Sequence, residues 1–316
     1  MSKLRVCILG GTGFVGQHLS TCLAKQGHRV RVLTRHRERH RDLLVLPTAE
    51  VVEADIYDSN VLLRQFSGMD AVINLIGVLH DERRAGHGFQ HAHVELARKI
   101  LTACGKAGVK RILHMSALNA DSGKGSSHYL RSKGEAEHIM HNTAHIAVTS
   151  FRPSVIFGPG DSFLNRFAGL LRLTPRLAPF LLVCPEARFA PVYVGDVVNA
   201  MAQSLTDKRT FGKRYELCGP TVYALKQIVQ LTAQYIAEPR TIIGLGDALS
   251  KLIAMLPGKF FTMDNYNSMK KDSVCSKPFP DVFNLSPTAL ESVAPLYLGK
   301  QRGRARLFSY RTQARR

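Results

Sequence analysis

Short apolar runs alternate with helix-like stretches through the first half of the chain. Six runs are mostly apolar and lack polar alternation, which is typical of strands that are buried on both faces of a parallel sheet. They are Arg5–Leu9, Val30–Leu33, Val51–Glu53, Ala71–Ile76, Arg111–Met115 and Ala147–Phe151. The segments between them carry apolar residues at helical spacing, as at Leu96, Ile100 and Leu101. This alternation predicts an α/β fold, a doubly wound parallel sheet with helices on both faces.

The pattern changes beyond about residue 155, where it becomes irregular and richer in proline. The prolines of this region include Pro159, Pro175, Pro179, Pro185 and Pro191. We expect residues 1–155 to form the sheet domain, with later strands contributed by about 190–220, and 156–299 to form a smaller, irregular lobe. Residues 300–316 are basic and contain no acid. They predict a separate tail, which is either a solvated end or a binding arm.

The charge balance points to an anionic partner. The chain has 316 residues with 43 Lys+Arg and 24 Asp+Glu, a net charge of +19. Nucleic acid, acidic lipid, an acidic protein face or a phosphorylated ligand fit such an excess. No recognition motif or aromatic-and-basic platform is present, so we expect no nucleic-acid partner. No apolar run approaches the roughly 18–20 residues of a membrane span, which argues against an integral membrane protein.

Cysteine placement and the amino-terminal pattern suggest a compartment. The six cysteines are Cys7, Cys22, Cys104, Cys184, Cys218 and Cys275. They form no CxxC and no Cys/His cluster, so we expect no metal site and a reducing compartment. The first apolar run begins at Leu4, which leaves no room for a targeting segment. The pattern predicts a cytoplasmic chain of bacterial type.

A glycine-rich segment follows the first predicted strand. It reads Gly10-Gly11-Thr12-Gly13-Phe14-Val15-Gly16 and leads into the helix-like Gln17–Lys25. Gly10 permits a tight turn, Gly13 lets backbone N–H groups approach a pyrophosphate, and Gly16 lets the helix pack closely on the strand. The helix N-terminus then faces the anion. This arrangement predicts a dinucleotide site, and a plain tight turn is the alternative.

The end of the second strand indicates which dinucleotide binds. An acid there accepts hydrogen bonds from a free ribose 2′-hydroxyl, but this chain has Arg35. A guanidinium suits a 2′-phosphate, so NADP(H) is the preferred cofactor and NAD(H) the second choice. The alternative is that Arg35 and the arginines that follow it form a solvated helix start together with Glu38 and Asp42. Asp55 and Ile56 follow the third strand and are placed to frame the adenine, with a turn or cap role as the alternative for Asp55.

Tyr129 and Lys133 place a phenol and an ammonium four residues apart on one helix face. A nearby cation lowers a phenol pKa from its ordinary value of about 10, which suits proton transfer to or from a substrate oxygen. Ser116 ends the Arg111–Met115 strand and is expected to hydrogen-bond that oxygen, or else to secure the following loop. A second pair at the same spacing, Tyr266 and Lys270, lacks a preceding strand and is interpreted as structural.

The histidines do not suggest catalysis. His114 lies within a predicted strand, where a satisfied buried histidine is the favoured interpretation. Most of the others sit in polar stretches and are predicted to lie on the surface; they include His36, His40, His87, His91 and His93.

Together these motifs resemble the extended short-chain dehydrogenase/reductase superfamily, also called the NAD-dependent epimerase/dehydratase family. The resemblance covers about residues 4–235. The resemblance becomes more specific in four stretches, residues 74–77, 129–137, 152–161 and 191–197. These stretches resemble the branch that contains the nucleotide-binding accessory subunit of respiratory complex I and its bacterial relatives. The resemblance implies a Rossmann domain holding NADPH and carries the cofactor role onto Gly10, Thr12, Gly13, Phe14, Gly16, Arg35, Leu75, Gly77, Tyr129, Lys133 and Pro153.

Two functions follow from these residues and the resemblance. The first is an NADPH-dependent oxidoreductase or epimerase-type enzyme with Tyr129 as general acid/base, Lys133 lowering its pKa and Ser116 positioning a carbonyl. The second is a redox-inactive NADPH-binding assembly or sensor protein, with a respiratory complex as partner. The stretch Phe163–Val183 is rich in Leu, Phe and Pro, so we expect an apolar or amphiphilic, quinone-like substrate. The alternative is that this stretch forms the core of the second lobe.

A membrane surface is the last predicted partner. Leucine and isoleucine recur at helical spacing within Ile242–Met263, with Lys251 and Lys259 nearby. Such spacing usually marks a helix packed on its own core. Combined with the basic tail, it predicts weak, salt-sensitive attachment to an anionic membrane, on the inner face of the cytoplasmic membrane.

Overall fold

The computed structural model describes residues 3–79, 81, 86–256 and 261–299. The chain forms two compact units, each assembled from separate stretches. Unit 1 comprises Met1–Arg152, Val197–Glu216 and Pro280–Leu285, and unit 2 comprises Pro153–Asp196, Leu217–Phe279 and Ser286–Arg316. The predicted basic tail and Lys259 lie outside the described residues.

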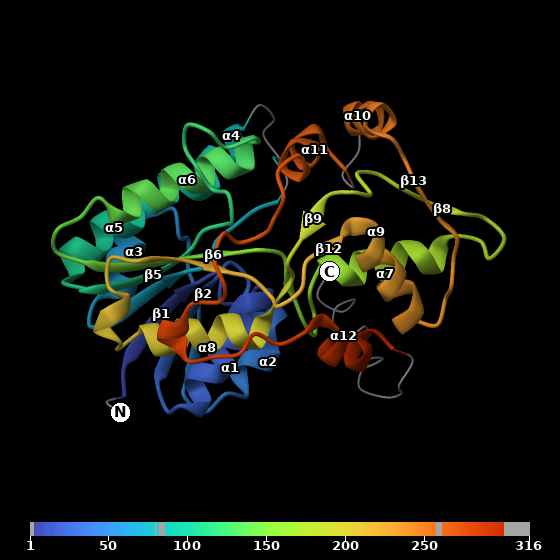
Figure 1. The fold of residues 1–316 in the computed structure, drawn as a ribbon. Helices are drawn as coiled ribbons and strands as arrows, with labels where there is room; N and C mark the ends of the chain where they lie inside the picture. Colours follow the sequence, from blue (N-terminus) through green and yellow to red (C-terminus); the bar gives the residue numbers. More distant parts are fainter. Residues whose placement is uncertain (1–2, 80, 82–85, 257–260, 300–316) are drawn as a thin grey trace. The chain divides into compact units, whose positions relative to one another are not determined.

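Unit 1 is built on a seven-stranded sheet (Figure 1). Its strands are β1 (Arg5–Leu9), β2 (Arg29–Thr34), β3 (Ala49–Glu53), β4 (Ala71–Asn74), β5 (Arg111–Met115), β6 (Ala147–Pro153) and β11 (Arg214–Leu217). They lie in the order β11-β6-β5-β4-β1-β2-β3, and every pair from β6 to β3 is parallel. The six strands predicted from the apolar runs are present, and the predicted doubly wound α/β fold is confirmed.

The strand order reverses at β1, which pairs with β2 on one side and with β4 on the other. In sheets of this kind, ligands bind outside the carboxyl ends of the strands at the reversal. The topology therefore singles out the loops after β1 and β4. β4 ends at Asn74, two residues before the predicted end, because the Asn74 Oδ1 accepts a 3.1 Å hydrogen bond from the Ile76 N–H and turns the chain.

Helices cover both faces of this sheet, with α3, α5 and α6 on one face and α1 and α8 on the other (Figure 1). The helices are α1 (Phe14–Lys25), α2 (Arg41–Leu44), α3 (Ser59–Phe66), α4 (His87–Phe89), α5 (Leu96–Ala107), α6 (His128–His141) and α8 (Val194–Ser204). Leu96 and Ile100 of α5 are fully buried against the sheet, as their helical spacing predicted. Burial of these apolar faces supplies the main driving force for this layered packing.

Gly16 lies where α1 crosses the loop after β1, and a side chain there has no space. A Cβ on Gly16 would lie 2.4 Å from the Gly10 carbonyl oxygen and 2.4 Å from the Gly11 Cα. Both are backbone atoms, so we expect Gly16→Ala to lower the free energy of unfolding by about 1–3 kcal/mol in urea denaturation. Gly105→Ala in α5 is the control, because no atom lies within 4 Å of the added Cβ. An unchanged urea midpoint for Gly16→Ala contradicts this close approach.

Unit 2 consists of short strands and helices. Its strands are β7 (Ile156–Phe157), β8 (Phe180–Leu182), β9 (Arg188–Phe189), β10 (Val192–Tyr193), β12 (Tyr223–Ala224) and β13 (Ile242–Gly244). Its helices are α7 (Phe163–Leu173), α9 (Leu225–Tyr235), α10 (Asp247–Met255), α11 (Met263–Met269) and α12 (Leu290–Leu298). The strands pair as β7 with β10, β8 with β13, and β9 with β12. No helix in the described part of the chain has the length and apolar character needed to cross a membrane.

The apolar stretch Phe163–Val183 divides between the core of unit 2 and its surface. Leu164 and Leu171 are buried in a cluster with residues of α9 and α12. Leu177 and Leu181, in contrast, are exposed. The core alternative therefore holds for the inward face of α7, and the exposed leucines follow that helix.

Unit 2 also contains a disulfide between Cys218 and Cys275, which corrects the expectation of reduced cysteines for this pair. The two residues are 57 positions apart, and their Cα atoms lie 5.9 Å apart. Backbone hydrogen bonds bring them together: Ala190 accepts from Gly219, and Ala190 donates to Ser273. The pairing thus depends on strand contacts between distant segments, which no cysteine spacing reveals.

Candidate functional site

The loop after β1 leads into a helix whose N-terminus has no side-chain cap. Gly10 has a φ of +77°, in the left-handed region, and its carbonyl accepts a 3.1 Å hydrogen bond from the Gly13 N–H. The Thr12 carbonyl accepts a 2.8 Å bond from the Gln17 side chain. α1 begins at Phe14 without a side-chain cap and without an acid in its first turn. No side chain in the described part of the chain caps its first N–H groups, and the positive end of the helix suits an anion.

The loop after β4 lies against this turn and against Lys133. A Cβ on Gly10 would lie 3.1 Å from the Leu75 carbonyl carbon. A Cβ on Gly77 would lie 3.1 Å from the Lys133 Nζ. The structure thus brings together four residues to which the sequence assigned a cofactor role.

Lys133 is fixed by the backbone of two neighbouring strands. Its Nζ donates 3.0 Å hydrogen bonds to the carbonyls of Ile76 and Met115, which follow β4 and end β5. The side chain is buried, and burial lowers the pKa of its ammonium to about 8, an effect that the Glu137 charge partly offsets. An ammonium has three N–H groups. The third has no acceptor among the described residues, and Gly77 lies so close that a Cβ there would be 3.1 Å from Nζ.

Tyr129 is the second residue of α6, one turn before the lysine, and it is half-buried. Its ring meets those of Phe89 and His93 edge to face, with centroids 5.9 and 5.7 Å apart. It also packs against the small cluster that contains Ala117, the residue after Ser116. The fold therefore brings Tyr129 to the loop that begins at Ser116.

His93 is buried, so its predicted surface position is wrong. Its Nε2 accepts a 3.2 Å bond from the Val78 N–H, which leaves the proton on Nδ1. Nδ1 donates to the Ser132 Oγ at 2.9 Å, and Ser132 donates to the Tyr129 carbonyl at 2.9 Å. Burial, with a further contribution from the Lys133 charge, lowers the pKa of His93 to about 2. A neutral histidine thus connects the β4 loop to the first turn of α6.

A helical spacing is the signal that would have found His93. It lies four residues after Phe89 and three before Leu96, and both are buried. His91, two residues earlier, is partly exposed and pairs with Glu95 at 2.8 Å. Because the residues next to His93 in the sequence are polar, its inward-facing position was not predicted.

Ser116 directly follows β5, and its N–H donates a 2.8 Å bond to the Phe151 carbonyl. Its hydroxyl is buried and has no partner in hydrogen-bonding geometry among the described residues. It still lies near enough to Glu137 to help hold the pKa of that carboxyl down. A buried hydroxyl without a partner is uncommon in proteins, so Ser116 has an unused donor and acceptor at this strand end.

Glu137 is a buried residue that the sequence did not single out. Arg152 bonds both of its carboxylate oxygens, at 2.6 Å from Nη2 and 2.9 Å from Nε. Arg214 adds a 2.6 Å bond from Nε. Burial alone raises the pKa of Glu137, but the hydrogen bonds from Arg152, with a smaller contribution from the nearby Ser116 hydroxyl, bring it below its ordinary value. The carboxylate therefore joins α6 to β6 and β11.

His114 of β5 is buried, as predicted, but only one of its ring nitrogens has a partner among the described residues. Its Nδ1 accepts a 3.2 Å bond from the Asn74 amide, while Nε2 has none. Burial, with a further contribution from the Lys133 charge, lowers the pKa of His114 to about 3. The neutral ring therefore serves packing between β4 and β5.

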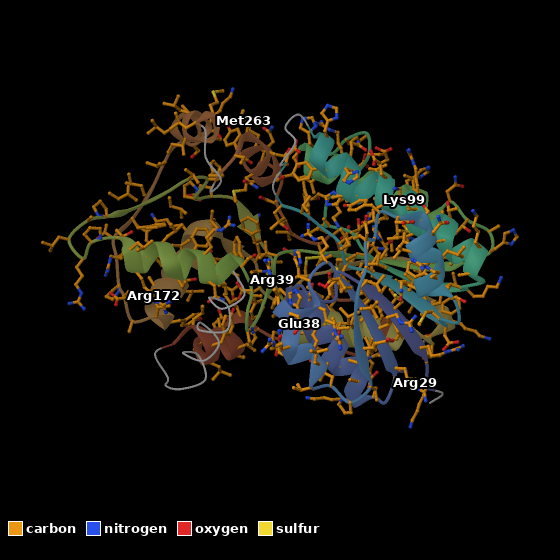
Figure 2. The ribbon with its side chains drawn as sticks, turned by 180° about the vertical axis from the view of Figure 1, so that it is seen from behind. Arg29, Glu38, Arg39, Lys99, Arg172 and Met263 are labelled. Carbon is orange, nitrogen blue, oxygen red and sulfur yellow. A yellow bond between two sulfur atoms is a disulfide. The ribbon has the colours of Figure 1, made fainter. Side chains whose placement is uncertain are left out.

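Arg35 follows β2 at an exposed position and makes no hydrogen bond or ion pair with any described residue. A neighbouring arginine differs from Arg35 in its contacts. Arg41 pairs with Glu38 at 3.7 Å, which is the solvated arrangement given as the alternative for these arginines. Glu38 and Arg39 are both exposed on the turn after β2 (Figure 2). The Arg35 guanidinium is thus available to a ligand at the carboxyl end of β2.

Asp55 and Ile56 have structural contacts. The Asp55 Oδ1 accepts a 2.9 Å bond from the Tyr57 N–H, which is the turn role given as the alternative. Ile56 is partly buried against the core of unit 1. Pro153 is buried at the end of β6. These three share the carboxyl edge of the sheet, and their contacts with a cofactor stay predictions.

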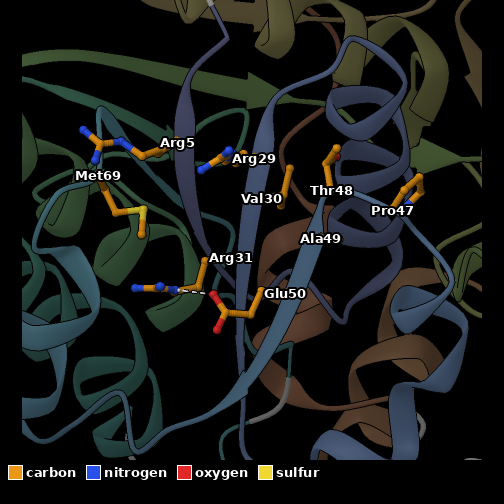
Figure 3. A pocket seen from close by; sticks show the side chains of 9 residues that line it. All are labelled: Arg5, Arg29, Val30, Arg31, Pro47, Thr48, Ala49, Glu50 and Met69. Carbon is orange, nitrogen blue, oxygen red and sulfur yellow. Dashed lines mark hydrogen bonds and ion pairs between the residues drawn. The ribbon is translucent and has the colours of Figure 1, made fainter.

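Two hollows are lined by other residues, one hollow in each unit. One, of about 530 Å³, is lined by the amino-terminal ends of β1, β2 and β3 and includes Arg5, Arg29 and Arg31 (Figure 3). Arg5 pairs with Asp70 and Arg31 with Glu50, so two of its three cations are neutralised. Because ligands of such sheets bind at the carboxyl ends, this hollow is not the dinucleotide site.

The other hollow, of about 540 Å³, lies in unit 2 and includes Tyr266 and Lys270. The Tyr266 hydroxyl donates a 2.7 Å hydrogen bond to Asp247, and the Lys270 Nζ lies 4.8 Å from the centre of the Tyr266 ring. These contacts join α11 to α10. They agree with a structural role for this second tyrosine–lysine pair.

Comparison with known proteins identifies the family. The model of the NAD dependent epimerase/dehydratase family matches residues 6–218. The chain is 30% identical over 295 residues to subunit 9 of the 1 alpha subcomplex of mitochondrial NADH dehydrogenase (ubiquinone) of Arabidopsis thaliana, covering 87% of this chain and 72% of that protein. It is 34% identical over 194 residues to the ceramide reductase of Caulobacter vibrioides, covering 60% of this chain and 57% of that protein.

A solved structure shows the same fold over nearly the whole chain. The UDP-glucose 4-epimerase of Thermotoga maritima superposes with a TM-score of 0.73 at 17% identity, covering 93% of this chain and 97% of that one. The family match, the relatives and the strand order with its glycine turn agree. The chain belongs to the NAD-dependent epimerase/dehydratase family.

Proposed function

We propose that the chain binds NADP(H) and acts as an NADPH-dependent oxidoreductase or epimerase-type enzyme on an apolar or amphiphilic carbonyl or quinone-like substrate. The observation that carries this proposal is the Lys133 ammonium, which two backbone carbonyls hold where the loops after β1, β4 and β5 meet. A buried cation with a spare donor, at the edge where such sheets bind ligands, is typical of a functional site.

The residues present fit a nicotinamide dinucleotide. The uncapped start of α1 suits the pyrophosphate, and the spare N–H of Lys133 suits a ribose hydroxyl beside Gly77. The exposed Arg35 suits a 2′-phosphate. When bound, the nicotinamide supplies or accepts a hydride. These three features are independent in sequence and meet at one edge of unit 1.

The protein's own part in the reaction is proton transfer and positioning. The Tyr129 hydroxyl donates a proton to the substrate oxygen or removes one from it, and the Lys133 cation favours the phenolate form. Ser116 has an unused hydroxyl that donates to the same oxygen. His93 and Ser132 hold the backbone of Tyr129 at the start of α6. Each task falls to a side chain that the fold already fixes.

Two observations support an amphiphilic substrate. The ceramide reductase of Caulobacter vibrioides is named for a lipid, and it is 34% identical to this chain over 194 residues. Leu173, Leu177 and Leu181 leave apolar surface on unit 2. Both favour a lipid-like carbonyl compound over a sugar nucleotide.

A redox-inactive NADPH-binding assembly protein is the second candidate. The relative in Arabidopsis thaliana, which matches 87% of this chain, is a subunit of NADH dehydrogenase. In that case the nucleotide stabilises the fold, and a respiratory complex is the partner. The Tyr129 and Lys133 side chains then serve binding alone.

The two candidates differ in turnover. Mass spectrometry of the purified full chain identifies any retained nucleotide, and NADPH consumption is measured against a panel of long-chain carbonyl compounds, ceramide precursors and quinones. We expect bound NADP(H) and consumption with at least one member of the panel. Bound nucleotide without consumption supports the assembly protein. Absence of measurable affinity for either nucleotide contradicts both candidates.

Cofactor preference depends on Arg35. We expect NADPH to bind at least tenfold tighter than NADH, which corresponds to about 1.4 kcal/mol, and Arg35→Asp to remove most of that preference. Fluorescence titration with both nucleotides measures it. Arg39→Asp, another exposed arginine on the same turn, is the matched control and leaves the ratio within about twofold. Equal affinities of the wild type for the two nucleotides overturn the assignment.

A further inference from the structure

α10 in unit 2 presents large apolar side chains to solvent. Leu249, Leu252, Met255 and Leu256 are exposed by 52%, 57%, 59% and 60%. The first three belong to the helix and recur at intervals of three residues, so they lie toward one side of it, and Leu256 directly follows its last residue. We call this face the α10 apolar face. It follows directly on β13 (Figure 1).

The buried residues of α10 are the small Ser250 and Ala254, while leucines of the helix are exposed, which is unusual for a surface helix. Ser250 is fully buried, and its Oγ accepts a 3.1 Å bond from the Cys184 N–H. Ala254 is also buried. Asp247 accepts the 2.7 Å bond from the Tyr266 hydroxyl of α11. These contacts fix the orientation of the helix, so the leucines project outward because of how unit 2 packs.

Three exposed lysines lie on α10 and at the end of α11. Lys251 is exposed on the helix itself, and Lys270 and Lys271 are exposed at the end of α11, which packs on α10. Acids lie in the same segments: Asp247 accepts the Tyr266 hydroxyl bond, Asp264 is in the first turn of α11, and Asp272 pairs with Arg188 at 3.9 Å. The whole chain carries a net charge of +19. An apolar helix face with an exposed lysine, on a chain of this net positive charge, suits an anionic bilayer, where it buries side chains below the headgroups and keeps its lysine among them.

We propose that α10 is a monotopic membrane anchor that inserts the α10 apolar face into the interface of an anionic lipid bilayer. The adjacent strands extend the apolar surface. Ile243 of β13 and Leu181 of β8 are register partners, exposed by 45% and 58%. The anchor uses residues of unit 2 alone, so it stands independently of the proposed nucleotide chemistry.

The chain contains no tryptophan, which allows a single-site test in the full-length protein. Leu252→Trp places one indole on the α10 apolar face, and Leu296→Trp places one on α12 at a leucine that is 72% exposed. With vesicles of phosphatidylglycerol and phosphatidylethanolamine at low salt, we expect the emission of Leu252→Trp to shift to the blue and to be quenched by doxyl-labelled acyl chains. Leu296→Trp should do neither. Pure phosphatidylcholine vesicles should leave both spectra unchanged.

Cosedimentation measures how strongly the protein binds to the vesicles. We expect the wild type to partition onto the same anionic vesicles, less at high salt, and Leu252→Glu/Met255→Glu to lower the partition coefficient at least tenfold. Thermal denaturation and NADPH titration of this variant report on its folding, and the Leu252→Trp signal stands if it fails to fold. The proposal is overturned if the wild type ignores anionic vesicles at low salt. It is also overturned if the protein binds them while the Leu252→Trp emission does not move, which would assign the binding to another surface of the chain.

Discussion

Tyr129→Phe is expected to reduce kcat by about 10²–10⁴-fold with little change in nucleotide affinity, because it removes the proton donor and leaves the ring contacts in place. Lys133→Met is expected to weaken both turnover and binding. That variant loses the spare N–H beside Gly77, and it also removes the hydrogen bonds to Ile76 and Met115. Steady-state kinetics and fluorescence titration with NADPH measure the two effects separately.

The second tyrosine–lysine pair provides the matched control. Tyr266→Phe removes the bond to Asp247 in unit 2, so turnover and nucleotide affinity should stay within about twofold of the wild type. Loss of activity in both tyrosine variants would point to a general defect in folding. Retained turnover in Tyr129→Phe rejects the proton-transfer role outright.

Glu137→Gln is expected to lower the free energy of unfolding by about 3 kcal/mol. Breaking a buried ion pair typically costs about 3–5 kcal/mol, and the lower end applies because Arg152 and Arg214 are partly exposed and regain water. For a protein of 316 residues the melting temperature should fall by roughly 4–5 °C. The pKa of Glu137 is lowered in the fold, so its stabilisation is present above the ordinary carboxyl range and is lost as the pH falls through the lowered value. The difference between variant and wild type should therefore shrink in acid.

Glu38→Gln is the control for this stability measurement. Glu38 pairs with Arg41 at 3.7 Å, and both side chains are more than 70% exposed. Exposed pairs contribute about 0–1 kcal/mol, so this variant should melt close to the wild type. If Glu38→Gln and Glu137→Gln melt alike, the buried carboxylate does not hold α6 to the sheet.

Much of unit 1 could be predicted because its determinants are local. A strand buried on both faces must be apolar at successive positions, so Arg5–Leu9 and Arg111–Met115 were found to the residue. The glycine turn was equally visible, since Gly10 requires a positive φ and Gly16 has no room for a Cβ. These features can be predicted from a few consecutive residues of the sequence.

The rest depends on contacts between distant segments. Cys218 and Cys275 pair because strands of unit 2 bring them together across 57 positions. Glu137 is buried because Arg152 and Arg214 arrive from two other strands. α10 has the leucine spacing of a core helix, yet its small residues pack inward. The spacing of apolar residues alone does not determine which face of such a helix packs against the rest of the protein.

The order of the sheet strands in the sequence has a consequence during synthesis on the ribosome. β6 ends at Pro153, and its neighbour β11 begins only at Arg214, with 60 residues of chain between them. At about 5–20 residues per second, β6 spends roughly 3–12 s as an edge strand before its neighbour is made. Its backbone groups are unpaired on that side for this interval, and its apolar side chains make it a template for aggregation. Newly made chains should therefore rely on chaperone protection at this stage, and a stop codon placed between the two strands should yield an insoluble product.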